Sequence, residues 1–251
     1  MEHMSTCRQS AAALRPLTAR RQLRRSMLAL VCVVGVRGVV AAPPPAAEAE
    51  CSLSGVVRYV PDPQRPWRYS RYYVADPKSG ALAETVVSLS RRGLKNFRPR
   101  ENPETVTIDQ VDYRFTPETV VIRAGDSVRF TNSDPGLHNV SALGGSELLN
   151  VSLLRDSEHI HTFRRAGNAR SPVRIGCSLH SQMQAWVFVF DHPFYALTGP
   201  DGKFRIEGVP PGEYTLEVVH PAGSLSRSLP VTLTAGEARA IEIQLSPNDK
   251  D

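Results

Sequence analysis

Three side chains that bind soft metals lie within seven residues, in the segment Cys177-Ser-Leu-His180-Ser-Gln-Met183. They offer a thiolate, an imidazole and a thioether, and this combination suits copper better than any other biological metal. A fourth candidate, His138, is followed by Asn139 and lies far away in the sequence. A thiolate and two neutral imidazoles form a trigonal set, and a thioether adds a weak axial contact that favours Cu(I). The sequence therefore predicts one copper ion held by His138, Cys177, His180 and Met183.

A disulfide, a zinc site or plain core packing could also account for some of these residues. Removal of an export signal would leave only Cys51 and Cys177, and two cysteines in an oxidising compartment commonly form a disulfide. Structural zinc would be expected to show paired Cys or Cys/His spacings and no Met. Met183 alone could be a core residue at the start of a strand. The copper interpretation is preferred because it accounts for Cys177, His180 and Met183 together with the remote His138.

The elements that must position these side chains are short strands, rich in β-branched and aromatic residues and bounded by Gly, Pro, Asn or Asp. We expect strands at 53–60, 85–90, 105–109, 119–123, 127–132, 138–142, 172–176, 185–190, 203–206, 214–220, 229–234 and 240–245. Residues 147–155 alone indicate a helical turn. This spacing predicts an all-β protein made of β-sandwiches.

The predicted strands explain how the ligands would meet. Strand 172–176 leads into Cys177, and strand 185–190 begins just past Met183, so three ligands share one loop between strands. His138 comes from a separate loop. A ligand from a distant element ties the loop to the sandwich, so the fold, rather than the metal, sets the geometry.

Composition narrows the class of protein. The 251 residues are 41% hydrophobic, enough for one or two ordinary domains, and the formal net charge is +5. Residues 1–49 contain seven of the 30 basic and two of the 25 acidic residues, so the remainder has 23 of each. The excess positive charge therefore belongs to the N-terminal segment, and we do not interpret it as a nucleic-acid footprint.

That N-terminal segment is typical of a secretory signal. The arginine-rich stretch 20–25 precedes an apolar run from Met27 to Val36, which is shorter than the roughly 20 residues of a membrane span. Small residues follow, and we favour cleavage after Ala49. Arg20-Arg21 also permits a twin-arginine route. The protein is expected to be exported, to the periplasm or beyond.

Residues 104–191 resemble a cupredoxin, the type 1 blue copper domain of the plastocyanin, pseudoazurin and amicyanin group. The matching elements are Phe115-Thr-Pro117, Arg123-Ala-Gly-Asp126, Phe130-Thr-Asn132, His138-Asn-Val140 and Cys177-x-x-His180-x-x-Met183. The two-residue spacing on each side of His180 is similar to the short ligand loop of amicyanins, although Leu179 and Ser181 stand where amicyanins have proline.

The resemblance also implies roles for single residues. His138 and His180 would bind through imidazole nitrogen, Cys177 through sulfur, and Met183 axially. Asn139 corresponds to a residue that braces the ligand loops by hydrogen bonding.

The last third resembles a second module, the carboxypeptidase regulatory-like or transthyretin-like β-sandwich. The segments that carry this resemblance are 197–206 and 209–218, with Gly55-Val-Val-Arg-Tyr59 and Val86-Val-Ser-Leu89 as counterparts of its opening strands. The implied architecture is a cupredoxin Greek-key sandwich inserted in, or joined to, this second sandwich. Both parts, in the same order, resemble bacterial proteins often named methylamine utilization proteins, a name that implies electron transfer but does not establish methylamine as substrate.

The expected domains follow from these resemblances. They are a signal peptide with a Pro/Ala spacer at 1–49, the first strands of the second sandwich with a basic linker at 50–103, the cupredoxin copper domain at 104–191, the carboxypeptidase regulatory-like sandwich at 192–247 and a tail at 248–251.

The expected function is that of an exported blue-copper electron-transfer protein. We do not expect an enzyme, because neither a second metal centre nor a pocket with acid and base groups can be assembled. The expected partners are a redox donor and acceptor that bind transiently near Leu137, Leu179 and the edge of His180. The mature chain is expected to be a monomer without a membrane span. The alternatives are a copper storage or carriage protein and a structural sandwich with a degenerate site.

Beyond the N-terminal segment, four other histidines and a basic stretch have no place in this site. His159 and His161 indicate either surface histidines or an extra metal site. We expect His192 at the junction of the two sandwiches and His220 at a strand end. The basic segment 91–103 is interpreted as a solvated linker or a dock for an acidic partner.

Overall fold

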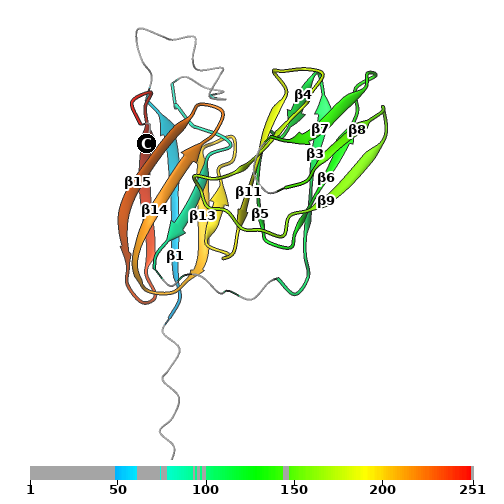
Figure 1. Ribbon diagram of the computed structural model, residues 1–251. Helices are drawn as coiled ribbons and strands as arrows, with labels where there is room; N and C mark the ends of the chain where they lie inside the picture. The colour runs from blue at the N-terminus through cyan, green and yellow to red at the C-terminus, as the bar shows by residue number, and fades with distance from the viewer. Residues whose placement is uncertain are drawn as a thin grey trace, which may run out of the picture. The chain divides into compact units, whose positions relative to one another are not determined.

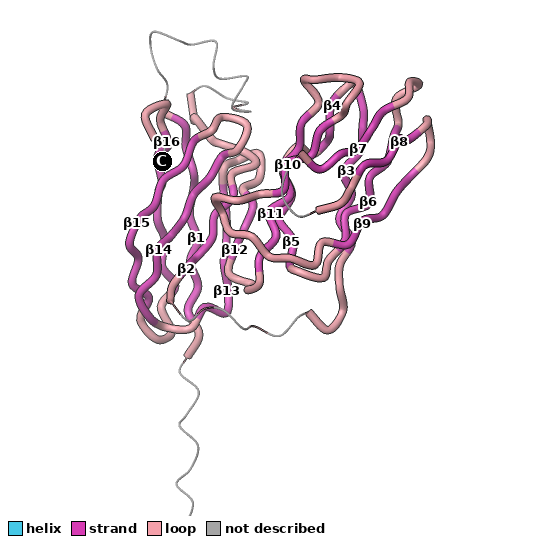
Figure 2. Tube along the Cα trace, viewed as in Figure 1, coloured by secondary structure: helices cyan, strands magenta, loops and turns pink. Residues whose placement is uncertain are grey.

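The chain is all-β over the residues that the structure describes, as the sequence predicts. The computed structural model describes residues 49–60, 74, 78–92, 94, 97, 100–143 and 147–249. Figure 2 shows strands and loops throughout this part of the chain, and no helix. It consequently contains no helix long and apolar enough to cross a membrane. The export signal predicted within 1–49 lies, except for Ala49, outside the described residues.

Nine strands between Thr105 and Phe190 form the first sandwich (Figure 1). One sheet has the strand order β5-β11-β10-β7-β8 and the other has the order β4-β3-β6-β9. The strands are β3 (Thr105–Val111), β4 (Arg114–Thr116), β5 (Thr119–Arg123), β6 (Ser127–Asn132), β7 (His138–Ala142), β8 (Asn150–Leu153), β9 (Glu158–Thr162), β10 (Val173–Gly176) and β11 (Gln184–Phe190).

Alternation along each strand builds the core of this sandwich. In β6 the buried side chains are Val128, Phe130 and Asn132, while the residues between them are half-buried. Two of these three belong to an apolar cluster that also contains Cys177 and Met183. The period of two residues therefore turns one face of the strand toward the core and places the ligand loop beside it.

The second sandwich uses strands from both ends of the chain. Its sheets have the strand orders β13-β1-β16 and β12-β2-β14-β15, so β1 and β2 share sheets with strands that follow the first sandwich. The strands are β1 (Cys51–Tyr59), β2 (Val86–Ser90), β12 (Tyr195–Leu197), β13 (Lys203–Val209), β14 (Gly212–His220), β15 (Leu225–Leu233) and β16 (Ala238–Leu245). The first sandwich is thus inserted between β2 and β12.

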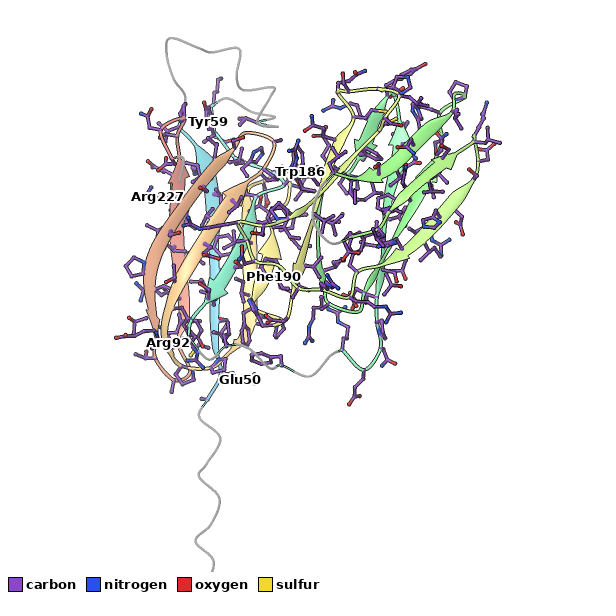
Figure 3. All side chains as sticks on the ribbon, in the orientation of Figure 1. Glu50, Tyr59, Arg92, Trp186, Phe190 and Arg227 are labelled. Atoms are coloured by element: carbon purple, nitrogen blue, oxygen red, sulfur yellow. The ribbon has the colours of Figure 1, made fainter. Side chains whose placement is uncertain are left out.

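Strand β11 is buried on both faces. Ala185, Val187 and Val189 belong to the core of the first sandwich. Phe188 and Phe190 belong to a smaller cluster with Val86 of β2, against which Trp186 also packs; Figure 3 labels Trp186 and Phe190 on this strand. A strand covered on both sides needs a continuous apolar run, which explains the sequence Ala185-Trp-Val-Phe-Val-Phe190.

The structure corrects the prediction for residues 147–155. They contain β8, which pairs antiparallel with β7, instead of a helical turn. The reason is tertiary pairing: Leu153 is buried in the core while Asn150 and Ser152 are exposed, so the segment alternates as a strand does. The predicted strands also omit β9 and the three-residue strands β4 and β12; the last two are too short to show a period.

Candidate metal centre

Three strands bring the predicted ligands to one end of the first sandwich. His138 is the first residue of β7, and Cys177 directly follows β10. Strands β7 and β10 are neighbours, with Gly176 paired to Ser141. The loop after Cys177 returns at once to β11, which begins one residue past Met183. Antiparallel pairing of β10 with β7 and β11 therefore places His138 beside the ligand loop.

The loop between Cys177 and Met183 is closed by its own backbone. The amide of Cys177 donates to the carbonyl of Met183 at 3.3 Å, and the amide of Met183 donates to the carbonyl of His180 at 3.1 Å. These bonds fold the seven residues into a compact loop.

The donor atoms converge. The Nδ1 atoms of His138 and His180 lie 3.1 Å apart, and Sγ of Cys177 lies 3.7 Å from Nδ1 of His180. One ligand atom from each of the three residues lies within 4.8 Å of the others. A thiolate and two imidazole nitrogens directed at one position fit a soft or borderline metal, and copper with a nearby thioether matches this set well.

The four candidate ligands differ in burial. His138, Cys177 and Met183 are buried, with His138 at 0% exposure and Met183 at 1%, whereas His180 is half-buried. Met183 lies in the same apolar cluster as Cys177. The site is therefore sealed from the core side and reaches solvent at the His180 ring.

Asn139 links both halves of the site. Its side-chain amide donates to Oδ1 of Asn150 at 2.9 Å and to the carbonyl of Val151 at 3.0 Å, while its Oδ1 accepts from the amide of Ser178 at 3.4 Å. Its own backbone amide donates to Sγ of Cys177 at 3.3 Å. Asn139 therefore connects the ligand loop to β8 and gives the thiolate a hydrogen bond.

Two residues near the site were not predicted from the sequence. Oδ2 of Asp134 lies 2.7 Å from Nε2 of His138, whereas Nδ1 is the nitrogen of that ring that contacts His180. The ring of Tyr113, half exposed, stands edge-on to both imidazoles, with centroids 5.5 Å from His138 and 5.1 Å from His180. The only sequence signal for Asp134 is its position four residues before His138, separated by a Pro-Gly turn.

The carboxyl group of Asp134 is ionised at neutral pH. Burial on its own raises the pKa, but hydrogen bonds from the Tyr113 amide, the His138 ring and the Asp112 amide outweigh it, so the pKa lies below the ordinary 3.8. An ionised carboxylate only accepts hydrogen bonds, so Asp134 is the acceptor toward the His138 ring.

The two described cysteines do not form a disulfide. Both thiols are free and buried. Cys51 lies in the core of the second sandwich, where its Sγ is 3.0 Å from the carbonyl of Thr234, and Cys177 lies in the core of the first. The disulfide alternative is therefore wrong, and the sulfur of Cys177 is available to bind a metal.

The other described histidines lie apart from the ligand cluster. His161 pairs with Glu147, Nε2 to Oε2, at 3.0 Å, and His159 stacks beside it; the described residues hold no other cluster of three or more candidate ligands. His192 packs between Phe190 and Phe194, and burial lowers its pKa. His220 is completely buried at the end of β14.

Two leucines beside the site are exposed. Leu137 is 44% exposed and Leu179 is 54% exposed, each next to a histidine of the cluster in sequence.

The basic segment 91–103 is only partly described; within it Arg100 pairs with Glu104 and lies 3.8 Å from Asp126.

The described strands form two β-sandwiches, and the first of them holds the cluster of His138, Cys177 and His180. Residues 183–246 match the model of the carboxypeptidase regulatory-like domain. This match begins at Met183 and includes β11, although β11 pairs with β5 and β10 of the first sandwich. The search of curated proteins found no match.

Several solved structures are similar to part of the chain. A purple cupredoxin from Nitrosopumilus maritimus is 22% identical, covering 34% of this chain and 98% of its own, with a TM-score of 0.30. Amicyanin from Paracoccus versutus is 21% identical, covering 41% and 97%, with a TM-score of 0.31. A copper-containing nitrite reductase from Thermus scotoductus is 23% identical, covering 53% of this chain but only 28% of its own, with a TM-score of 0.31.

Proposed function

We propose that the chain is an exported electron carrier with one type 1 copper ion, bound by His138, Cys177 and His180 with Met183 as the axial ligand. The observation that carries the proposal is the convergence of two Nδ1 atoms and a buried cysteine sulfur at one end of a β-sandwich. Copper in such a site supplies one-electron chemistry, cycling between Cu(II) and Cu(I).

The protein's own residues favour electron transfer. The ligands come from β7 and a loop tied to it through Asn139, so the geometry is held by the fold and little rearrangement is needed when the charge changes. The half-buried ring of His180 is the route to solvent, and the exposed Leu137 and Leu179 offer a small apolar contact for a transient partner.

The partners in this proposal are a reduced protein that donates one electron and an oxidised protein that accepts it. The proposal includes electron transfer but no particular substrate oxidation, so a link to methylamine metabolism is not part of it. It also includes export, a monomeric mature chain and no enzymatic turnover.

Cyclic voltammetry on mature protein loaded with one equivalent of Cu(II) tests the proposal against its alternatives. We expect stoichiometric copper binding and a reversible one-electron wave. Stoichiometric binding with no reversible wave would favour copper storage or carriage. Failure to bind copper would favour a structural sandwich with a degenerate site. Either of these two results would contradict the electron-carrier proposal.

A further inference from the structure

The carboxylate of Asp134 is the acceptor of three hydrogen bonds at the rim of the metal centre. Its Oδ2 lies 2.7 Å from Nε2 of His138 and 2.9 Å from the amide nitrogen of Tyr113, and its Oδ1 lies 2.8 Å from the amide nitrogen of Asp112. The residue is only 6% exposed. A buried, ionised carboxylate is stabilised only when donors surround it, and these three groups supply them.

The loop holds Asp134 in place independently of the metal. The amide of Asp134 donates to Oδ1 of Asn132 at 3.0 Å. The side-chain nitrogen of Asn132 donates to the carbonyls of Gly136 at 2.8 Å and Leu153 at 2.9 Å. Asn132 is itself buried at the end of β6, so the position of the carboxylate is set by the sandwich core.

The first consequence concerns the proton of His138. A neutral imidazole carries one hydrogen, on either Nδ1 or Nε2, and the partner of each nitrogen decides which. Because the Asp134 carboxylate can only accept, the hydrogen of His138 must lie on Nε2. The lone pair of Nδ1 is then directed toward Cys177 and His180, which is the state that a metal ligand requires.

The second consequence concerns Tyr113. Asp112 and Tyr113 form the two-residue turn between β3 and β4, and both have positive φ, 54° and 58°. Non-glycine residues adopt this conformation rarely, and the turn type normally uses Asn or Gly. The Asp134 carboxylate accepts both turn amides, which offsets the cost and places the Tyr113 ring against both imidazoles.

We propose that Asp134 is a positioning residue of the metal centre, which holds His138 in its Nε2–H form, places Tyr113 over the two imidazoles and lowers the reduction potential of bound copper. A carboxylate that accepts from the imidazole N–H makes the other nitrogen a stronger donor, and a stronger donor stabilises Cu(II) more than Cu(I). The effect on potential rests on the proposed copper function, whereas the effect on the imidazole proton does not.

The chain contains a matched control, Asp126. Its carboxylate is also buried and also accepts two backbone amides, from Glu104 and Arg123, each at 2.9 Å. It lies at the opposite end of β6, about 20 Å from the site for a six-residue strand. The variant Asp126→Asn therefore reproduces the loss of a buried carboxylate without touching an imidazole.

Voltammetry on copper-loaded protein compares Asp134→Asn with Asp126→Asn. We expect Asp134→Asn to lose about 10-fold to 100-fold in Cu(II) affinity, with a smaller loss for Cu(I), and therefore to have a higher potential. Each tenfold difference between the two losses corresponds to about 59 mV. Asp126→Asn should lower the melting temperature and leave the potential unchanged. An unchanged or lower potential in Asp134→Asn, or equal shifts in both variants, would overturn the proposal.

Nitrogen-15 NMR of the metal-free, wild-type protein provides a test that does not depend on how the variants fold. When the ring of His138 carries a single nitrogen-bound hydrogen, that hydrogen should be on Nε2, with Nδ1 unprotonated. Finding the single hydrogen on Nδ1 would overturn the assignment of Asp134. If the wild-type protein failed to give a reversible copper wave, the proposed function would fail while this measurement still decided the role of Asp134 toward His138.

Discussion

The ring of Tyr113 stands edge-on to the ring of His180, with centroids 5.1 Å apart and planes 85° apart. The same ring is perpendicular to His138, and it is 49% exposed. It therefore covers one side of both imidazoles. Its backbone has a φ of 58°, which a glycine would adopt at lower cost. Strained residues of this kind persist where the side chain has a purpose.

Replacing Tyr113 by Gly removes the ring and also relieves the strain of the positive φ. The variant therefore shows what the ring does for the site. We expect the free energy of unfolding to change by no more than about 1 kcal/mol, because relief of strain offsets the lost ring contacts and the greater freedom of the unfolded chain. Transfer of copper to a competing chelator should become severalfold faster, measured by stopped-flow absorbance. Tyr113→Phe keeps the ring and should behave as wild type; equal rates in the Gly and Phe variants would contradict a shielding role.

Asn139→Ala should remove the side-chain hydrogen bonds that connect the ligand loop to β8. The variant loses the side-chain contacts with Ser178, Asn150 and Val151, and we expect a loss of about 1–3 kcal/mol in the free energy of unfolding. Broader electron paramagnetic resonance lines of the Cu(II) form should accompany it, because the loop samples more conformations. Asn150→Ala, which removes one of the three contacts, serves as the control. Identical spectra in both variants would show that Asn139 does not hold the loop.

Met183→Gln should lower the reduction potential of the copper-loaded protein. A thioether is a soft, weak donor that favours Cu(I), whereas an amide oxygen is harder and stabilises Cu(II). Met183→Leu, which nearly conserves volume in this buried position, is the control for packing and should retain the fold. Voltammetry of both variants checks the prediction. A potential that does not fall in Met183→Gln would exclude Met183 as an axial ligand.

His220 should make the second sandwich less stable in acid. Burial lowers the pKa of this histidine from 6.5 to about 4, so the folded state keeps it neutral where the unfolded chain binds a proton. The contribution of neutral His220 to the free energy of unfolding is therefore fully present above pH 6.5, and it is lost as the pH falls toward 4. The loss is about 3 kcal/mol in total, at about 1.4 kcal/mol per pH unit.

Urea unfolding of the metal-free protein between pH 7.5 and pH 4 measures this dependence. His220→Gln can still accept from the amide of Gly223, which lies 3.1 Å from Nδ1 in the wild type, but it does not titrate. We expect a shallower pH dependence in the variant. Parallel curves for the two proteins would refute the prediction.

Much of the site was predictable because its signals are local. His138, Cys177 and His180 have distinctive chemistry, and the strands before and after them alternate strongly enough to be located from sequence. The bounds of 119–123, 127–132 and 138–142 agree with β5, β6 and β7. The convergence of the three donor atoms then follows from the pairing of β7 with β10.

Asp134 and Tyr113 were not predictable because their roles depend on tertiary contacts. Asp134 accepts from amides 21 and 22 residues away, and nothing in the local sequence relates the two segments. The helical turn predicted at 147–155 was wrong for a similar reason, because this segment becomes a strand through its pairing with β7. Local sequence patterns locate the strands. The conformations of the loops between them depend on tertiary contacts between segments that are far apart in the sequence.

The visible absorption spectrum of Cu(II)-loaded protein tests the central claim most directly, when Cys177→Ala and Cys51→Ala are compared with wild type. Both cysteines are buried and free, but only Cys177 lies with the histidines. We predict an intense thiolate-to-copper band in the wild type that disappears on reduction, persists in Cys51→Ala and is lost in Cys177→Ala. A wild-type protein that binds one equivalent of Cu(II) without this band, or a band that survives in Cys177→Ala, would contradict the type 1 copper site.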